Sequence, residues 1–393
     1  MANILNYLKN YHDQSFIDEP FNDADRLLFN ELSYLPIELL KSEEEMTLGK
    51  VGEALLSKAW RIHRDNPYLV TFNRLRMLRY ISESKRYQNI ILHHVCAKPT
   101  SDHGFPFVCF TLSHPSFSPF IVFRGTDDSM LGWRESLALT FEEDLESYRL
   151  ATHYIQSMLN KVYGEIELSG HSKGGHLAYM ATYYLTAKER QRIKRLTSFD
   201  APGVFEWVLE DRSFQRFTSR IIAYYPNHSV IGRVLWLPVK PIIVEATNAS
   251  GLIQHILNQW EIHDTQLKLT DAFSLESDFS TDLLMEWYSH TPTEDKERLH
   301  RLIFTILEVA KVDSFNTLMR HFWSSSNQIW LTVNHLPLED RQFILEQSHH
   351  FQELYTKVQK NQKYEGLLKQ RYLQWLVPVL SIEKIHSFFS LFH

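Results

Sequence analysis

The sequence predicts an α/β fold with a mostly parallel sheet flanked by helices, a helical segment before the sheet and a helical region after it. Three observations support this prediction. Short apolar runs alternate with helical stretches between about residues 90 and 246. Several of these runs are apolar throughout, as strands covered on both faces are. Outside them, apolar residues recur at helical spacing among charged ones.

Seven apolar runs are expected to form strands, and they are residues 90–96, 105–112, 119–125, 165–170, 195–200, 220–225 and 241–246. Strands that alternate with helices imply parallel neighbours joined by right-handed crossovers. Upstream, residues 20–35 have the pattern of a capped helix, because Asn22 precedes the apolar positions and Asp25 follows three residues later. Residues 42–88 are also helical in pattern.

After about residue 265 the strand pattern fades. In "TPTEDKERLHRLIFTILEVAK" we expect Thr291 to cap a helix and Pro292 to occupy its first position. One apolar stripe follows, from Leu299 to Ala310. The sequence therefore predicts an α/β domain over residues 1–265, with a helical segment at 1–88, and a helical region over residues 266–393 packed on it.

Composition narrows the class of protein. The 393 residues are 44% hydrophobic and 22% charged, and the net charge of −6 gives no reason to expect a nucleic-acid partner. The two cysteines, Cys96 and Cys109, lie in apolar runs and are interpreted as small buried hydrophobic residues, which fits a reducing compartment. No signal peptide or membrane span is predicted. We expect a cytoplasmic protein; peripheral membrane contact and the oligomeric state stay open.

One segment points to chemistry. Within "IELSGHSKGGHLAYMA", residues 170–174 match G-x-S-x-G, with a strand-like run before and a helix-like run after. This is the context of a nucleophile elbow, a tight turn that exposes Ser172 at the carboxyl edge of the sheet. The next backbone N–H, from Lys173, points into the same space and suits an oxyanion. The alternative is a glycine-rich turn with an incidental serine.

A second oxyanion donor is expected from the end of an earlier strand. "FIVFRGTDDSMLGW" supplies Thr126 there, although a simple solvated turn is the alternative. A serine nucleophile also needs an imidazole base. His255 is the best candidate because it follows the last strand-like run, as the chain order Ser, acid, His requires. His228 and His263 are weaker candidates.

No cofactor is expected, and no metal. Histidine pairs such as 93–94 and 349–350 are adjacent in the chain, so their side chains point apart on a strand or helix. Chelation of a metal ion by either pair is therefore disfavoured.

Four segments together, "FRGTDDSMLGWRES", "SGHSKGGHLA", "FDAPG" and "SVIGRVL…GLIQH…W", resemble the DUF2974 family. That family consists of uncharacterised bacterial proteins similar to class 3 lipases of α/β-hydrolase fold. The resemblance covers most of residues 1–265. It implies Ser172 as nucleophile, His255 as base, and Thr126 with Lys173 as the oxyanion hole. The implied activity is hydrolysis of an acyl ester, from a lipid or a small molecule.

The triad acid is where this chain departs from that family. The family usually has Asp before the S-[IV]-[IV]-G segment, where this chain has Asn227 and His228. We expect Asp200 to substitute, because it ends the strand after the elbow helix. Glu245 and a slow dyad without an acid are the alternatives. If no acid is present, the second hypothesis is a weak or inactive hydrolase-fold protein that binds a ligand or partner.

Overall fold

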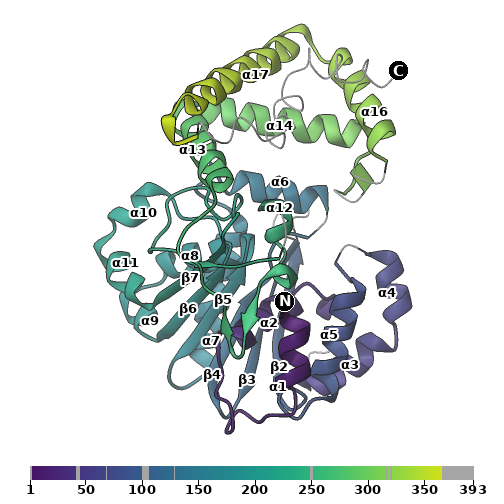
Figure 1. Cartoon of the computed structure of the whole chain (residues 1–393), viewed down its shortest axis with the longest axis vertical. Coiled ribbons are helices and arrows are strands. Elements are labelled where there is room, and N and C mark those ends of the chain that lie inside the picture. Colours follow the sequence, from purple (N-terminus) through teal and green to yellow (C-terminus); the bar gives the residue numbers. More distant parts are fainter. Residues whose placement is uncertain are drawn as a thin grey trace. The chain divides into compact units, whose positions relative to one another are not determined.

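The structure is a computed structural model, and it describes residues 2–40, 45–67, 69–99, 106–127, 129–247, 251–314, 317–318 and 321–364. The chain divides into two compact units, Met1–Phe273 and Ser274–His393. Figure 1 shows the elements of each unit. The predicted packing of residues 266–393 on the α/β domain stays a prediction.

An eight-stranded sheet organises the first unit, and its strands lie side by side in the order of the sequence (Figure 1). They are β1 (Met46–Thr47), β2 (Ile91–Pro99), β3 (Pro106–His114), β4 (Phe117–Phe123), β5 (Ile166–His171), β6 (Ile193–Phe199), β7 (Ile221–Pro226) and β8 (Ile242–Val244). Strands β1 to β4 pair antiparallel, and β4 to β8 pair parallel. All seven predicted strands are confirmed. A small second sheet pairs β9 (Ile262–His263) with β10 (Gln266–Leu267).

The helices that connect the parallel strands cover one face of the sheet. Because consecutive strands are neighbours, right-handed crossovers place every connecting helix on the same side. These helices are α6 (Met130–Ala138), α7 (Glu146–Lys161), α8 (Lys173–Tyr184), α9 (Ala187–Gln191), α10 (Glu206–Glu210) and α11 (Arg212–Phe217), followed by the short η2 (Thr218–Arg220). On this face Tyr154 of α7 bonds through its hydroxyl to Thr111 of β3, at 2.8 Å.

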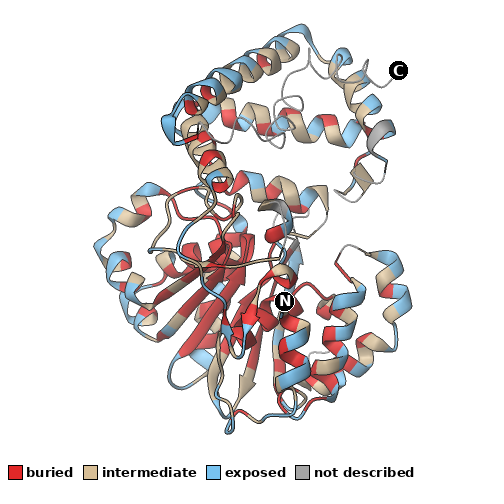
Figure 2. Ribbon diagram, in the orientation of Figure 1, coloured by how far each residue is buried: buried red, intermediate tan, exposed pale blue. Residues whose placement is uncertain are grey.

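The opposite face needs a separate cover, and the N-terminal segment supplies it. Its helices are α1 (Ile4–Tyr11), α2 (Asp23–Leu32), η1 (Ile37–Leu40), α3 (Leu48–Leu56), α4 (Ala59–Asp65) and α5 (Phe72–Glu83). One hydrophobic core joins these helices to alternate residues of the strands, including Phe110, Leu112, Phe120 and Val122. The strands at the centre of the sheet are consequently buried on both faces, as Figure 2 shows.

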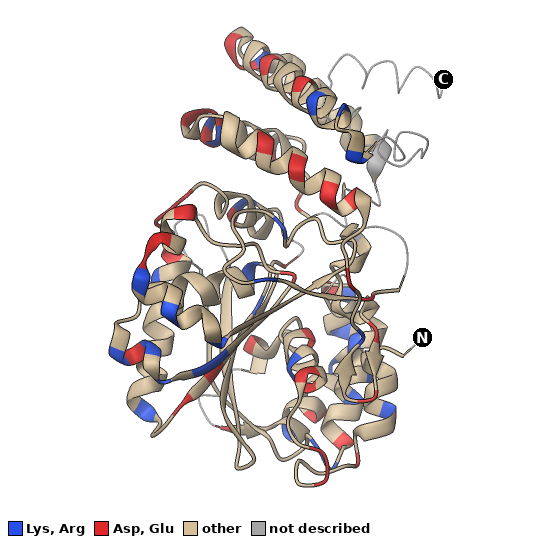
Figure 3. Cartoon of the chain, turned by 60° about the vertical axis from the view of Figure 1, so that its left-hand side comes forward, with Lys and Arg blue, Asp and Glu red and all other residues tan. Residues whose placement is uncertain are grey.

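Helix α2 lies against this face and is fixed by charged side chains. The predicted cap is confirmed: Asn22 accepts from the N–H of Asp25, whose carboxylate accepts from the N–H of Asn22. Arg26 forms a buried ion pair at 2.7 Å with Glu167 of β5. Removing one partner of such a pair leaves a buried charge, so the pair favours one orientation of α2. Elsewhere, positively and negatively charged residues are both spread over the helices (Figure 3).

The second unit is helical in its described part. It contains α13 (Leu275–His290), α14 (Thr293–Val309), α16 (Phe322–His335), α17 (Leu338–Gln359) and η4 (Gln362–Tyr364). A small core joins α13, α17 and η4 through Phe279, Leu283, Leu354, Val358 and Tyr364.

One predicted helix boundary in this unit is wrong by one residue. Helix α14 begins at Thr293, with Pro292 rather than Thr291 at the cap position. The reason is the extended backbone of Pro292, whose ψ of 149° keeps it outside the helix. The fold class itself, an α/β-hydrolase-like sheet flanked by helices, is confirmed.

Candidate active site

Ser172 lies between β5 and α8, in the tight turn that the sequence predicts. Its φ of 55° and ψ of −130° define a backbone conformation that residues other than glycine rarely adopt. The turn is compact because its flanking glycines have no side chains. A Cβ on Gly170 would lie 2.1 Å from the carbonyl carbon of Gly174, and one on Gly174 would lie 2.0 Å from the carbonyl oxygen of Phe123. Strand β5, helix α8 and strand β4 therefore approach closely only with glycine at both positions.

Asp200 and His255 meet at the same edge of the sheet. Asp200 directly follows β6, the parallel neighbour of β5, and is completely buried. His255 follows α12 (Gly251–Gln254), and its Nδ1 lies 2.6 Å from Oδ2 of Asp200. A carboxylate bonded to Nδ1 fixes the tautomer with a proton on Nδ1 and leaves Nε2 as the acceptor.

The loop after β7 holds Asp200 from the other side. The hydroxyl of Ser229 donates to Oδ1 of Asp200. A Cβ on Gly232 would lie 2.2 Å from that same oxygen, so only glycine leaves room for the carboxylate. The S-x-x-G segment, singled out in the sequence for lacking a carboxylate, thus contacts a carboxylate from the neighbouring strand. The sequence analysis assigned no role to Ser229 or Gly232.

The other predicted acids and bases lie in different surroundings. Glu245 forms an ion pair with Lys268, at 2.6 Å. The backbone N–H of His228 donates to Oε1 of Gln254, at 3.0 Å. The side chain of His263 is 80% exposed and lies 3.2 Å from Asp264. Of the acids considered, Asp200 is the one that contacts His255.

His171 connects the serine turn to the histidine loop. Its Nε2 lies 2.8 Å from the carbonyl oxygen of His255, and its Nδ1 lies 2.5 Å from the hydroxyl of Tyr34. Burial, reinforced by the nearby charge of His255, holds the pKa of His171 well below its usual range. The neutral ring therefore donates from Nε2 and accepts from Tyr34 at Nδ1. No local sequence signal identified this chain of contacts.

The hydroxyl of Ser172 and the ring of His255 share no hydrogen bond among the described residues. The rings of His171 and His255 lie 4.5 Å apart, which brings His255 next to the serine turn. Such contacts are commonly long in structures without a ligand and shorten when substrate binds.

The predicted oxyanion residues follow two neighbouring strands, Thr126 after β4 and Lys173 after β5. Thr126 follows β4, the other neighbour of β5, and its hydroxyl bonds to that of Ser136 in α6. Lys173 directly follows Ser172 and is the first residue of α8. Its side chain points elsewhere: Nζ forms a buried ion pair with Glu135 of α6, at 2.7 Å. This ion pair links helix α6 to the first residue of α8.

A cavity of about 450 Å³ opens beside the turn after β4. Apolar side chains make up much of its wall, namely Leu39, Ile62, Leu69, Val70, Phe107 and Val108. Tyr34, Arg124 and Asp127 line it next to the turn. Tyr34 therefore belongs both to the cavity and, through His171, to the serine turn.

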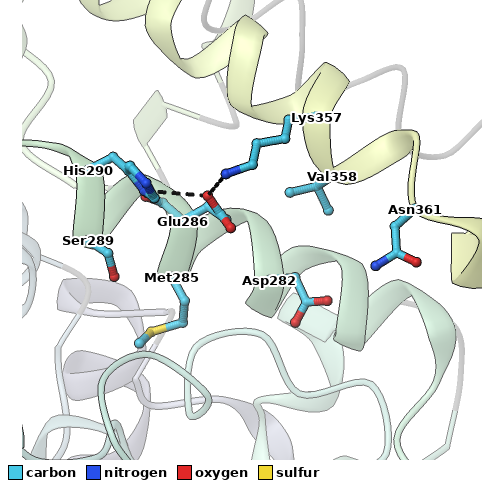
Figure 4. Close-up of a pocket in the computed structure, with 8 residues that line it drawn as sticks. All are labelled: Asp282, Met285, Glu286, Ser289, His290, Lys357, Val358 and Asn361. Atoms are coloured by element: carbon cyan, nitrogen blue, oxygen red, sulfur yellow. Dashed lines mark hydrogen bonds and ion pairs between the residues drawn. The ribbon is translucent and has the colours of Figure 1, made fainter.

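A second cavity, of about 380 Å³, lies within the second unit (Figure 4). It is lined by Asp282, Met285, Glu286, Ser289, His290, Lys357, Val358 and Asn361. Glu286 pairs with Lys357 at 2.7 Å and lies 3.4 Å from His290. Asp282 accepts from Tyr364. Both carboxylates that line this cavity therefore already interact with side chains of the protein.

Two kinds of feature are absent from the described residues. No group of three or more His, Cys, Asp or Glu side chains gathers there as a metal site would require. Within the same residues, every helix is too short or too polar to cross a bilayer.

The chain is similar to one known family and, more remotely, to solved structures of lipases. A family model described as Mbeg1-like matches residues 81–305, more than half of the chain. The crystal structure of M37 lipase is 14% identical, with a TM-score of 0.31 over 55% of this chain and 70% of that one. A Rhizomucor miehei lipase propeptide complex is 11% identical, with a TM-score of 0.28 over 56% and 81%. No curated protein matches the chain.

Proposed function

The chain belongs to the Mbeg1-like family, and from this premise and the geometry of its elbow we propose that it is a serine hydrolase of acyl esters. The observation that carries the proposal is the contact of 2.6 Å between His255 and Asp200, at the sheet edge where Ser172 stands in a strained turn. Backbone strain of this kind costs about 1–3 kcal/mol and persists where surrounding packing enforces it, commonly at active sites.

In the proposed mechanism Ser172 Oγ attacks the acyl carbon while Nε2 of His255 takes its proton. Asp200 holds the Nδ1 proton and stabilises the imidazolium that forms. The backbone N–H groups of Lys173 and Thr126 bind the oxyanion, and loss of one such donor typically costs about 3–4 kcal/mol of barrier. His255 then protonates the leaving alcohol. A water molecule, activated by the same imidazole, releases the acid and restores Ser172.

We assign the acyl group of the substrate to the cavity beside the turn after β4. Its wall is largely apolar, and burying apolar surface favours binding by about 25 cal/mol per Å². Tyr34 joins this cavity to the serine turn through its 2.5 Å contact with His171. An acyl chain placed there has its carbonyl next to the turn that contains Thr126.

The test is labelling of the full chain with a fluorophosphonate probe, which reacts with activated serines. We expect one adduct per chain, located at Ser172 by peptide mapping. The variants Ser172→Ala and His255→Ala should both lose labelling while melting within a few degrees of wild type. An unlabelled wild-type chain, or equal labelling of Ser172→Ala, would contradict a serine hydrolase. It would favour the binding protein without turnover.

A second experiment addresses the acyl site. Leu39 lines the cavity and is 53% exposed, so Leu39→Trp narrows the opening without filling the core. We expect this variant to lose activity on long p-nitrophenyl acyl esters and to keep it on the acetate. The control is Ile17→Trp, at an exposed position outside the cavity lining. Equal losses for all chain lengths would argue against the cavity as acyl site, without affecting the assignment of Ser172.

A further inference from the structure

The only two cysteines of the chain lie directly opposite each other on β2 and β3. In the register of this antiparallel pair the partner of Cys96 is Cys109, and both are free thiols. We propose that they form a reversible redox pair, which closes a disulfide across the two strands when the protein meets a low-molecular-weight disulfide such as oxidised glutathione. The sequence-based interpretation of both as small buried hydrophobic residues is confirmed for Cys109, whereas Cys96 is only partly buried.

The backbone spacing suits this bond. Directly opposite residues of antiparallel strands have Cα atoms about 4.5–5.5 Å apart, and disulfides span about 4.4–6.8 Å. The register is irregular between His93 and Cys96, and His94 has a φ of 53°, so this part of β2 departs from regular strand geometry. We therefore expect β2 to allow the small shift that brings the two sulfur atoms to bonding distance.

The environments of the two thiols differ in the way that a redox pair requires. Cys96 is partly exposed, whereas Cys109 is buried. The hydrogen bond from Cys109 lowers the pKa of the Cys96 thiol to about 7, although partial burial opposes the change. Burial raises the pKa of the Cys109 thiol well above its usual range. Cys96 is thus the accessible thiolate that attacks, and Cys109 is the second thiol that resolves.

The exchange balances in two steps. The Cys96 thiolate attacks one sulfur of oxidised glutathione, forming a mixed disulfide and releasing one glutathione thiolate, which takes a proton from water. Cys109 then loses its proton and attacks the Cys96 sulfur, which breaks the mixed disulfide. The second glutathione leaves as a thiolate and is protonated. The two cysteines lose two electrons together, and oxidised glutathione gains them to give two molecules of the thiol.

The bond would form next to the cavity described above. The neighbouring pair in the same ladder, Ala97 and Val108, lines that cavity from the other face of the strands. On its other side Cys109 pairs with Phe123, the last residue of β4. A disulfide here links two strands of the cavity wall and restricts their separation in the unfolded chain as well.

The experiment uses the full-length reduced protein equilibrated with mixtures of oxidised and reduced glutathione. Intact mass and maleimide labelling count the remaining thiols, and peptide mapping locates any bond. We expect both thiols to disappear together, with loss of two hydrogen masses, one peptide linking residues 96 and 109, and full reversal by dithiothreitol. The oxidised protein should melt at least about 3 °C higher than the reduced one, because a disulfide that closes a loop of this length is stabilising.

Two variants separate the roles of the thiols. Cys109→Ala should accumulate one glutathione on Cys96 and show no rise in melting temperature on oxidation. Cys96→Ser should leave the Cys109 thiol unmodified in the folded protein. The proposal is overturned if wild type stops at the glutathione adduct with Cys109 still reduced, if it forms disulfide-linked dimers instead, or if both thiols stay reduced in oxidised glutathione alone. The wild-type readout stands even if a variant fails to fold.

Discussion

Nδ1 of His255 lies 2.6 Å from Oδ2 of Asp200, and the two residues are separated by 55 positions in the chain. Asp200 follows β6, one strand beyond the elbow strand β5. The sequence resemblance placed the acid before the S-x-x-G segment, which follows β7. Here that segment contributes Ser229 and Gly232 to the surroundings of Asp200 instead.

If Asp200 is the triad acid, Asp200→Asn should lower kcat by about 10⁴, because the amide favours the wrong tautomer of His255. His228→Asp, which restores the residue usual in the resembling family, should change kcat less than tenfold. Steady-state kinetics on a short ester measures both. A gain of tenfold or more in His228→Asp would mean that Asp200 does not serve as the acid.

Ser172 should show a trade-off between stability and activity. Ser172→Gly removes a side chain from a residue with φ of 55°, a backbone that glycine adopts without strain. We expect the free energy of unfolding of Ser172→Gly to exceed that of Ser172→Ala by about 1 kcal/mol, and its melting temperature to be correspondingly higher. Both variants should lose esterase activity. Thermal denaturation compares the two directly. Equal stabilities would indicate that the elbow carries no strain.

Tyr34 should influence kcat indirectly, by holding the ring of His171 in position. Tyr34→Phe removes the partner of a buried imidazole nitrogen, which typically costs about 1–3 kcal/mol of stability. Because His171 also contacts the carbonyl of His255, kcat should fall as well. The matched control is Tyr179→Phe, which removes a buried hydroxyl bonded to Ser198. If both variants lose stability and kcat to the same extent, His171 has no positioning role.

His176 should make the fold sensitive to acid. Its Nε2 lies 2.8 Å from the hydroxyl of Tyr148, and its Nδ1 lies 2.6 Å from the carbonyl of Gly203. Burial lowers the pKa of His176 from the usual 6.5 to about 4. Between these two values the unfolded chain binds a proton that the native state does not, so this stability is complete above pH 6.5 and decreases as the pH falls toward 4.

The corresponding loss of unfolding free energy is about 3 kcal/mol between pH 7 and pH 4. Urea denaturation at a series of pH values measures it. In His176→Gln, which cannot titrate, the slope over this window should decrease. His171 is buried with a pKa lowered in the same direction and adds to the slope of both proteins. An unchanged slope in the variant would contradict the assignment to His176.

Replacing one residue of the Lys173–Glu135 ion pair should destabilise the fold more than replacing both. Both side chains are almost fully buried, so Lys173→Met strands the charge of Glu135 and should destabilise the fold by about 3–5 kcal/mol. The double variant Lys173→Met, Glu135→Leu should recover most of this loss, because neither charge remains. Since the backbone N–H of residue 173 is kept, the double variant should retain esterase activity. A double variant that is stable but inactive would assign a role in the reaction to one of the two side chains.

By itself the sequence determined the features that depend on neighbours along the chain. Apolar runs bounded by turn residues identified all seven predicted strands, and Asn22 with Asp25 identified the start of α2. The glycines on either side of Ser172 identified the elbow, because a turn that tight needs them within four residues of one another. These patterns are local, so they can be recognised without knowledge of the fold.

Only the tertiary structure decided which distant side chains meet. Sequence order favoured Asp200 as the acid but did not exclude Glu245, since both follow strands whose carboxyl ends lie at one edge. Contacts such as that of His171 with Tyr34 depend on how α2 packs across the sheet. The pairing of Cys96 with Cys109 depends on a register that one residue of slippage would abolish. Packing and register are set by the whole chain at once, and no short stretch of sequence contains them.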